Sequence, residues 1–497
     1  MKGSLILKNL LDWKKLKSGS DIRGVVDIDN GNIICNETAK KIAIAFSIFL
    51  KNNKNIEISD QKISIGHDSR LSGIRFKDIF INSLASIGVY VYDCSLCSTP
   101  AISMATEILS CCASVEITAS HHPKEYNGFK FFTAEGGLKS KDIEKIIEIA
   151  YEFDFPKTNS KGNVRKINLM DKYCEFLKGL FIKSLGDDRP LQGTRIIVNA
   201  LNGVGGFFVY KVLDKLGADT YGSISLEPDG NFPECHPNPE NEKAIENTKK
   251  AIKDNNADLG IIFDADVDRS FFIDGNGNEI TKDMLVALVS KIILKEYPNS
   301  VIVTDSVTSD NLKLFIEKNS GFQFREKRGY QNVISAAKKL NEIGQPCYIA
   351  IETSGHAAFK ENFFRDDGSY LAVKIIIEMI KLKVDNKQII DLCEGFKSAE
   401  ETKEIRIKTK SRDPEKEISK IIRKIENYYK KIPNCKIDSE TPEGIRLIFD
   451  ESNHNGWCLI RKSAHDPDIV LNIESYKKNG VLKIFSEIEN IIKPVCE

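Results

Sequence analysis

One supersecondary pattern occurs three times along this chain. Each copy has an apolar strand-like run, a polar loop, a helix-like stretch, a glycine and a second extended run. The first runs of the three copies are residues 62–65, 194–198 and 300–304. The glycines are Gly88, Gly217 and Gly321. A strand, a helix that ends at glycine and another strand form a βαβ-type unit. Three copies predict three similar α/β domains with mixed sheets.

The last hundred residues have a different pattern. Residues 404–407 alternate like a half-buried strand, and Asp413-Pro414 begins a predicted helix. Further strands are predicted at residues 444–449, 457–461 and 469–473. This pattern indicates a smaller C-terminal α+β domain. For a chain of 497 residues we expect four domains, with the ranges 1–160, 161–276, 277–398 and 399–497.

Because the positive and negative charges balance, the chain has no strong net electrostatic field. Lys plus Arg and Asp plus Glu both total 71, so neither nucleic acid nor a membrane surface is an expected partner. No apolar run reaches about 18 residues, and the start lacks a secretory signal. We therefore expect a cytoplasmic protein, a monomer or weak homo-oligomer, that recognises small molecules through local charge.

The twelve cysteines indicate no metal or redox site. Cys94 and Cys97 form the only C-x-x-C pair, and a zinc ribbon would need a second pair at matching spacing. We interpret the cysteines as buried, reduced thiols.

A polar loop around Ser120 separates the predicted strands 113–117 and 128–133. Asn127-Gly128 predicts a tight turn that returns Lys130 toward the loop. The alternative is a turn serine that makes only a local backbone bond. A serine that carries a phosphoryl group has close to two negative charges and needs nearby cations.

Three alternating carboxylates follow the buried strand predicted at residues 259–263, and they are Asp264, Asp266 and Asp268. In a loop, such carboxylates can converge on one hard cation such as Mg²⁺. A solvated acidic turn is one alternative. An EF-hand is excluded, because Arg269 stands where glycine is needed and Gly275 where the bidentate Glu is needed. Arg269 suits a phosphate oxygen near the metal.

Two further loops carry candidate ligand-binding residues. Glu352 and Ser354 follow the predicted strand 347–351 and suit sugar hydroxyls, although an ordinary loop is the alternative. Arg461 and Ser463 follow a strand of the last domain and suit a phosphate, with a basic turn as the alternative. The glycine-rich residues 202–206 do not fit G-x-G-x-x-G and are interpreted as structural.

Together, these motifs and their order resemble the α-D-phosphohexomutase superfamily, from Asp21-Ile22-Arg23-Gly24 to the Arg461 loop. That superfamily includes phosphoglucomutases, phosphomannomutases and phosphoglucosamine mutases. It has three similar α/β domains and a smaller fourth domain, as the repeats predict. The resemblance implies a reversible transfer between hexose 1-phosphate and hexose 6-phosphate, of glucose or mannose. The transfer would pass through phosphoserine and a hexose 1,6-bisphosphate, which also serves as activator.

The resemblance also implies residue roles. The catalytic residues would be Ser120, His121, Arg23, Lys130, Arg269 and His356. The Mg²⁺ ligands would be Asp264, Asp266, Asp268 and an oxygen on phosphorylated Ser120. The substrate-binding residues would be Glu352, Ser354, Arg461, Ser463 and His465.

Several positions depart from the pattern of the superfamily. The residues His122, Ser20, Ala265 and His465 replace the usual Asn, Tyr, Gly and Thr. Val267 is β-branched, which argues against a positive φ in the metal loop. Gln331 stands where a cation is expected, with Lys327 and Arg328 as possible substitutes.

Tyr126 and the Ser-Gly-His of the sugar loop favour a phosphomannomutase/phosphoglucomutase. A phosphoglucosamine mutase, a hexose 1,6-bisphosphate synthase and a non-catalytic sugar-phosphate sensor remain alternatives.

Overall fold

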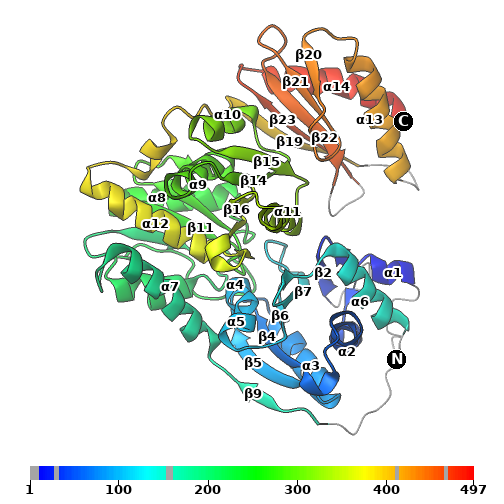
Figure 1. The fold of residues 1–497 in the computed structure, drawn as a ribbon, viewed down its shortest axis with the longest axis vertical. Helices are drawn as coiled ribbons and strands as arrows, with labels where there is room; N and C mark the ends of the chain where they lie inside the picture. The colour runs from blue at the N-terminus through cyan, green and yellow to red at the C-terminus, as the bar shows by residue number, and fades with distance from the viewer. Residues whose placement is uncertain (1–9, 27–32, 153–160, 409–413, 464–467, 497) are drawn as a thin grey trace. The chain divides into compact units, whose positions relative to one another are not determined.

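The computed structural model describes the chain except residues 1–9, 27–32, 153–160, 409–413, 464–467 and 497. The chain forms two compact units (Figure 1). Unit 1 is Met1–Thr281 with Ser354–Asp391, and unit 2 is Lys282–Thr353 with Leu392–Glu497. The chain therefore leaves unit 1, builds part of unit 2, returns to unit 1 and then completes unit 2.

The first sheet of unit 1 has the strand order β1-β2-β7-β6-β4-β5-β9, with β3 beside β2 and β8 beside β7. Its strands are β1 (Lys17–Ser18), β2 (Asp21–Val26), β3 (Ile33–Ile34), β4 (Lys62–His67), β5 (Tyr90–Leu96), β6 (Ala113–Ile117), β7 (Tyr126–Thr133), β8 (Gly136–Gly137) and β9 (Val164–Lys166). Strand β4 is parallel to β5 and β6, whereas β7 is antiparallel to β6 and β2. The predicted mixed sheet is confirmed.

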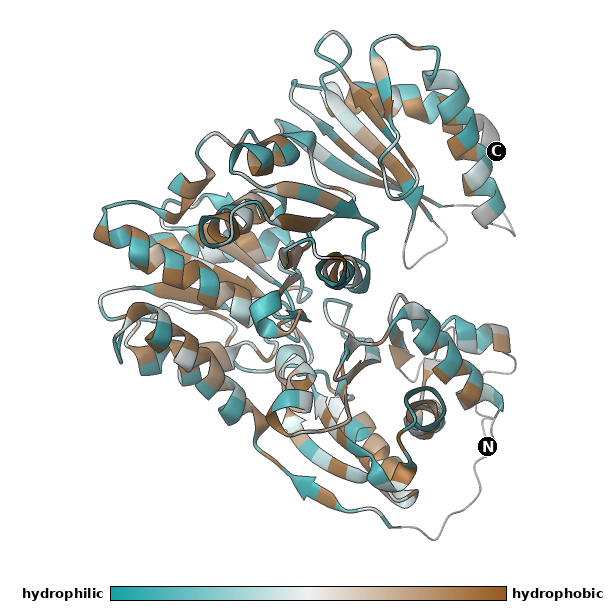
Figure 2. Cartoon of the chain, viewed as in Figure 1, coloured by the Kyte–Doolittle hydropathy of each residue, from teal (hydrophilic) through white to brown (hydrophobic). Residues whose placement is uncertain are grey.

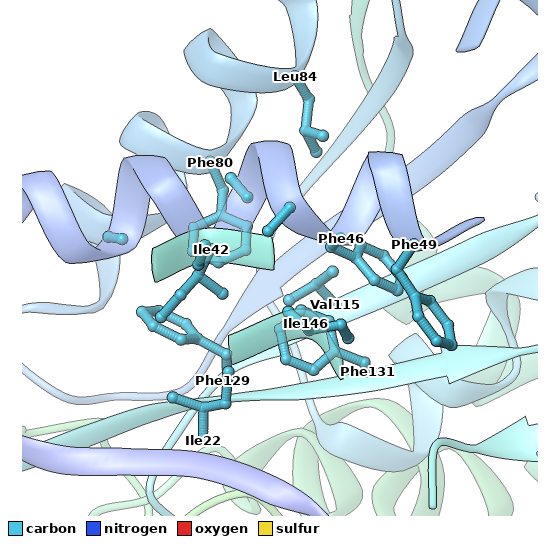
Figure 3. Packing of buried hydrophobic residues seen from close by; sticks show 14 of the residues in the cluster. Ile22, Ile42, Phe46, Phe49, Phe80, Leu84, Val115, Phe129, Phe131 and Ile146 are labelled. Carbon is cyan, nitrogen blue, oxygen red and sulfur yellow. The ribbon is translucent and has the colours of Figure 1, made fainter. Parts of the chain in front are cut away.

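Helices α2 (Asn36–Lys54), α3 (Gly73–Ser86) and α6 (Ser140–Glu152) supply apolar residues to one core with this sheet. Figure 3 shows Phe46 and Phe80 from the helices packed near Phe129 and Phe131 of β7. Asn55 follows the last residue of helix α2 and adopts the left-handed conformation that stops helices. The shorter helices of this part are α1 (Leu10–Lys14), η1 (Ile58–Asp60), α4 (Thr99–Ser103) and α5 (Ala105–Ile108).

The second sheet of unit 1 has the order β10-β11-β12-β13. Its strands are β10 (Ile196–Asn199), β11 (Leu259–Phe263), β12 (Ser270–Asp274) and β13 (Glu279–Ile280). Helices of this part are α7 (Leu169–Leu185), α8 (Glu242–Asn255) and α12 (Gly368–Val384). The returning segment also forms the hairpin β17 (Ala357–Phe359) and β18 (Arg365–Asp366), joined by η4 (Lys360–Asn362).

The second repeat copy differs from its prediction. The helix expected before Gly217 is a π-helix, η2 (Phe208–Leu213), followed by the 3₁₀ turn η3 (Asp214–Leu216). The extended run expected after Gly217 makes only isolated bridges, at Asp219 and Ile224, instead of a strand. The apolar pattern found the segments but did not determine their hydrogen bonding.

Unit 2 contains a parallel sheet and an antiparallel sheet. The parallel strands β14 (Val301–Asp305), β15 (Phe322–Glu326) and β16 (Cys347–Ile351) are accompanied by α9 (Lys282–Glu296), α10 (Asp310–Lys318) and α11 (Tyr330–Glu342). The antiparallel strands, in the order β19-β23-β22-β21-β20, are β19 (Glu401–Lys408), β20 (Cys435–Asp438), β21 (Ile445–Phe449), β22 (Gly456–Lys462) and β23 (Asp468–Ser475). The remaining helices are η5 (Ile389–Cys393), α13 (Pro414–Tyr429) and α14 (Gly480–Cys496).

The antiparallel sheet confirms the predicted C-terminal α+β domain. Helices α13 and α14 share a core with its strands, and Figure 2 shows apolar and hydrophilic residues interleaved along α13. Inside unit 2, the fully buried Arg446 of β21 donates to the carbonyl oxygens of Ser306 and Thr308 at 3.2 and 3.0 Å. The Arg446 guanidinium also lies 3.9 Å from the ring centre of Trp457, so this residue links the two sheets.

Candidate functional site

Ser120 lies in the loop between β6 and β7, and its side chain is buried. Its φ of 51° lies in the left-handed region, which non-glycine residues seldom adopt. The Ser120 N–H donates to Thr118 Oγ1 at 2.9 Å, and that hydroxyl donates to Asp68 Oδ2 at 2.6 Å. These bonds fix the loop in the conformation that presents the serine.

Arg70 binds the main chain of the same loop, and this role was not predicted from the sequence. Its guanidinium donates to four main-chain carbonyl oxygens, at 2.6, 2.6, 2.7 and 2.9 Å, of Ser120, His122, Pro123 and Tyr126. The Arg70 Nε also lies 3.2 Å from Asp68 Oδ2, and both side chains are fully buried. The signal was Asp68-Ser69-Arg70, a charged pair directly after the first strand of a repeat copy.

The predicted tight turn at Asn127-Gly128 is wrong. Both residues lie inside β7, and Gly128 pairs with Arg23 of β2. A Cβ on Gly128 would lie 2.3 Å from the carbonyl oxygen of Ile22 and 2.8 Å from that of Thr118. The glycine is therefore needed for close strand approach, and the turn occurs earlier in the loop.

The three predicted metal-ligating aspartates lie directly after β11 and are buried. One ligand atom from each of Asp264, Asp266 and Asp268 lies within 4.8 Å of the others. Contrary to the expectation, Val267 has a φ of 66°, a strained value for a β-branched residue. The surrounding loop therefore determines this conformation.

Neighbouring loops support the aspartate loop. Thr99, at the start of α4, donates its hydroxyl to Asp266 Oδ2 at 2.6 Å and its N–H to the Asp266 carbonyl at 2.9 Å. Val204 donates its N–H to the Ala265 carbonyl at 2.9 Å, and a Cβ on Gly203 would lie 2.5 Å from that oxygen. The glycine-rich residues 202–206 are structural, as expected, and they pack under the aspartate loop.

Ser120 and the aspartate loop meet within unit 1. The Ser120 hydroxyl donates to Asp264 Oδ2 at 2.8 Å. Arg269 donates from Nη2 to Ser120 Oγ at 3.3 Å and from Nε to Asp264 Oδ2 at 3.0 Å. His121 Nδ1 lies 3.4 Å from the same hydroxyl. A nucleophile, a carboxylate cluster and a guanidinium therefore share one buried location.

Lys130 of β7 enters the carboxylate cluster. Its ammonium donates to Asp266 Oδ2 at 2.7 Å and also to Asp268 Oδ2. Burial lowers the pKa of Lys130, but the two aspartates outweigh it and hold that pKa well above the usual value. Burial, followed by the charges of Asp268 and Asp266, raises the pKa of Asp264. The chain's own cations therefore compensate part of the acidic charge.

The aspartate cluster suits a divalent cation. Among the described residues, neither Asp266 Oδ1 nor Asp268 Oδ1 has a hydrogen-bond partner, although both are buried. Such oxygens are costly to leave unsatisfied, and carboxylate oxygens are the preferred ligands of hard cations. The three aspartates would hold the metal ion, and the Ser120 hydroxyl lies beside them.

Arg23 and His121 complete the surroundings of the serine. Arg23 Nη2 donates to Asp21 Oδ2 at 2.8 Å. Burial lowers the pKa of His121 well below its usual value, and the charges of Arg269 and Arg23 lower it further. The His121 imidazole is therefore neutral at neutral pH.

His356 and Ser354 belong to the segment that returns to unit 1. His356 forms an antiparallel bridge with Arg269, and its Nδ1 lies 3.6 Å from Asp366 Oδ2 and 3.9 Å from Asp268 Oδ1. Burial lowers the pKa of His356 to about 3. The Ser354 hydroxyl is buried and has no hydrogen-bond partner among the described residues. It is thus available for a ligand.

The other predicted substrate-binding residues lie in unit 2. Glu352 Oε1 accepts the N–H of Gly329 at 2.6 Å. Arg461, at the end of β22, donates from Nε to Asn472 Oδ1 at 3.2 Å, and burial followed by the charge of Arg328 lowers its pKa. Ser463 is buried, and its N–H donates to the Asp468 carbonyl at 2.9 Å. His465 lies outside the described residues.

The C-x-x-C pair lies in the interior of unit 1. Cys94 and Cys97 are both free thiols and buried, and burial raises the pKa of each. Such thiols are poor nucleophiles and metal ligands. The predicted burial of these two cysteines is confirmed.

Three family models match this chain in sequence. They are the alpha/beta/alpha domains I, II and III of phosphoglucomutase/phosphomannomutase, at residues 14–156, 171–277 and 281–397. A phosphoglucomutase/phosphomannomutase of Thermococcus kodakarensis is 31% identical over 481 residues, which cover 96% of this chain and 95% of that protein. A phosphomannomutase/phosphoglucomutase of Pseudomonas syringae is 30% identical over 456 residues, covering 92% and 90%.

The fold also matches a solved structure. A crystal structure of a phosphoglucomutase/phosphomannomutase family protein from Burkholderia thailandensis has a TM-score of 0.79 at 23% identity, covering 97% of this chain and 99% of that one. This likeness concerns the fold. None of the helices in the described ranges combines the length and apolar character needed to cross a membrane.

The three α/β domains, the C-terminal β-rich domain and these sequence matches define an α-D-phosphohexomutase. Enzymes of this kind are isomerases, because they transfer a phosphoryl group within one molecule. The chain belongs to the phosphoglucomutase/phosphomannomutase family and acts on hexose phosphates. The family is metal-dependent, in agreement with the buried aspartate cluster.

Proposed function

We propose that this protein interconverts the 1-phosphate and 6-phosphate of glucose, mannose or both, through phosphorylated Ser120 and a hexose 1,6-bisphosphate. One observation carries the proposal. The Ser120 hydroxyl lies 2.8 Å from Asp264 Oδ2 and 3.3 Å from Arg269 Nη2, beside three carboxylates that suit a cation. The names of the relatives, which pair phosphomannomutase with phosphoglucomutase, support the choice of sugars.

Charge neutralisation is the main task of the site. A transferring phosphoryl group spreads negative charge over its oxygens, so cations stabilise it in place. Arg269 already contacts the hydroxyl, and Lys130 and Arg23 supply two further positive charges. Mg²⁺ bound by the aspartates would supply additional charge neutralisation and would take an oxygen of phosphorylated Ser120 as a ligand.

The proposed phosphoryl transfer takes place in two steps. In the first, the bond between Ser120 Oγ and phosphorus breaks while a free sugar hydroxyl forms a new bond to phosphorus. The hydroxyl's proton passes to a neutral imidazole, and His121 and His356 are both neutral because burial lowers their pKa values. In the second step, Ser120 Oγ forms a bond to the other phosphorus of the bisphosphate while the bond from that phosphorus to its sugar oxygen breaks, and the imidazolium returns the proton to that oxygen. Hexose 1,6-bisphosphate also phosphorylates the enzyme initially and so activates it.

The remaining predicted residues bind the parts of the substrate that do not react. Glu352 and Ser354 would accept hydrogen bonds from sugar hydroxyls. Arg461, Ser463 and His465 would hold the non-reacting phosphate, because a guanidinium matches phosphate geometry. These roles separate recognition from phosphoryl transfer.

The proposal is tested by product analysis. The Mg²⁺-loaded protein, with catalytic glucose 1,6-bisphosphate, is incubated separately with glucose 1-phosphate, mannose 1-phosphate and glucosamine 1-phosphate. We expect 6-phosphates of glucose or mannose without phosphate release, and loss of conversion in Ser120→Ala. Ser290→Ala is the control, because Ser290 is a buried serine of α9 in unit 2.

Other outcomes select the alternatives. Preferred conversion of glucosamine 1-phosphate would indicate a phosphoglucosamine mutase. Accumulated bisphosphate would indicate a bisphosphate synthase. No conversion by protein phosphorylated at Ser120 would contradict catalysis of these substrates and favour a sugar-phosphate sensor.

A further inference from the structure

A glutamate of unit 2 lies between two arginines that come from different sheets. Arg328 follows β15, and its Nη1 donates to Glu404 Oε2 at 3.2 Å. Arg461 Nη2 lies 3.8 Å from the same oxygen. Asn472 also donates to Glu404 Oε2, at 3.0 Å. Two guanidiniums and an amide donor therefore converge on one carboxylate oxygen.

The exposure of this cluster differs among its members. The Arg461 side chain is 3% exposed, whereas those of Arg328 and Glu404 are 24% and 32% exposed. The other Glu404 oxygen accepts from Arg406 Nε at 3.0 Å, and Arg406 is more exposed still. Glu404 is therefore an ionised anion at a solvent-accessible place, where exchange for another anion needs little rearrangement.

The main chain at Arg328 ties this cluster to a predicted sugar-binding residue. Arg328 donates its N–H to Glu443 Oε1 at 3.0 Å. The next residue, Gly329, donates its N–H to Glu352 Oε1 at 2.6 Å. Because the two residues are adjacent, the Arg328 guanidinium starts from the same short segment that holds Glu352. A ligand that contacts both would have a sugar next to an anionic group.

We propose that the Glu404 carboxylate occupies the place of a substrate phosphate, which displaces it and binds between Arg328 and Arg461. This inference rests on the proposed function, in which Arg461 holds the non-reacting phosphate. It assigns to Arg328 the positive charge that Gln331 does not supply. Glu404 becomes an internal competitor, which weakens phosphate binding and keeps the arginines paired without substrate.

The charges explain why displacement is favourable. A sugar phosphate carries up to two negative charges and three acceptor oxygens, and guanidiniums bind it with paired hydrogen bonds. A carboxylate carries one charge and offers fewer acceptors. Once displaced, Glu404 keeps Arg406 as a partner near solvent.

The test is phosphate affinity, measured by titration calorimetry on the full chain with inorganic phosphate and with glucose 6-phosphate. We expect Glu404→Gln to lower the Kd about threefold or more, because the competing charge is gone. We expect Arg328→Met to raise it about tenfold, a typical loss for one charge-assisted pair. The charge-matched controls are Glu400→Gln and Lys339→Met, which change exposed residues of the same unit.

Turnover separates this inference from the proposed function. In steady-state assays, Arg328→Met should raise KM more than it lowers kcat, and Glu404→Gln should lower KM. An active wild type whose Kd for both ligands is unchanged or raised by Glu404→Gln would overturn the inference and leave the mutase intact. A wild type that neither converts hexose phosphates nor binds phosphate would instead overturn the proposed function.

Discussion

The aspartate cluster of unit 1 and the arginine cluster of unit 2 solve opposite charge problems. In unit 1, three buried carboxylates are compensated by Lys130 and Arg269 from the same chain. In unit 2, two guanidiniums are compensated by Glu404, which is 32% exposed. The Lys130 ammonium is buried, whereas the Glu404 carboxylate is partly exposed to solvent. The aspartate cluster of unit 1 therefore suits a resident metal ion, and the arginine cluster of unit 2 suits an exchangeable anionic ligand.

Burial also sets the energetic cost of each cluster. A buried ion that loses its partner keeps its desolvation penalty, whereas a partly exposed ion regains water. Substitutions in the unit 1 cluster should therefore affect stability strongly. Those in the unit 2 cluster should affect mainly binding.

The largest effect is expected from Arg70→Met. Its guanidinium serves four carbonyl oxygens and one buried carboxylate, so its loss leaves several buried acceptors unsatisfied. We expect the free energy of unfolding to fall by about 3–5 kcal/mol, measured with denaturant. Turnover should also fall, because the serine loop loses its support. Arg75→Met on α3 is the exposed control, and an equal loss there would contradict a specific role for Arg70.

Lys130→Met tests the contribution of the buried ammonium. Without metal, the cluster would keep three acidic side chains and lose one compensating charge. We expect the metal-free protein to lose about 3 kcal/mol of unfolding free energy. Added Mg²⁺ should raise the Tm more in this variant than in wild type, as measured by thermal melts. Glu404→Gln should leave the Tm nearly unchanged, and an equal loss in both variants would remove the contrast between the clusters.

The smallest effect is expected from Glu116→Met in β6. Glu116 is fully buried, and neither carboxylate oxygen has a hydrogen-bond partner among the described residues. Methionine should raise the unfolding free energy by about 1–3 kcal/mol, because an unsatisfied buried group is removed.

This gain should depend on pH. Burial, followed by the charges of Asp68 and Asp266, raises the pKa of Glu116 well above its usual value. The wild type therefore loses stability as the pH rises above the unfolded-state pKa of Glu, because unfolding then releases a proton. The advantage of Glu116→Met should grow from pH 5 to pH 8 in denaturant titrations. A constant or shrinking advantage would show that Glu116 is ionised and paired in the fold.

Sequence patterns predicted the strands well where apolar runs were buried. The strand before Ser120 and the strand before Asp264 have the predicted bounds, and every residue of both strands is buried, including Ser114 and Glu116 of the former. The loops after those strands carry the serine and the aspartates, although the two strands belong to different sheets of unit 1. The structure brings these residues together in unit 1 as the resemblance implied.

Contacts between residues far apart in the sequence determine the features that the sequence patterns did not predict. Asn127-Gly128 has the composition of a hairpin turn, but pairing with β2 overrides that local preference. Val267 adopts a positive φ because the neighbouring loops fix the aspartate loop. Thr99 gave no local signal and Arg70 gave only its charged neighbour Asp68, since the Asp266 partner of Thr99 and the four carbonyl partners of Arg70 lie at least 50 residues away. A single sequence shows which residues are polar, but not which carbonyl or carboxylate each will reach.

Because the chain crosses between the units, unit 1 cannot be completed in the order in which the chain is synthesised. Residues 354–391 emerge from the ribosome after the first part of unit 2, yet they complete unit 1. They bring His356 to Arg269 and Asp367 to the hydroxyl of Tyr173, at 2.7 Å. A nascent chain released before this segment would contain both Ser120 and the aspartate loop without the closing strand and helix. Translation must therefore pass residue 391 before the catalytic unit can finish folding.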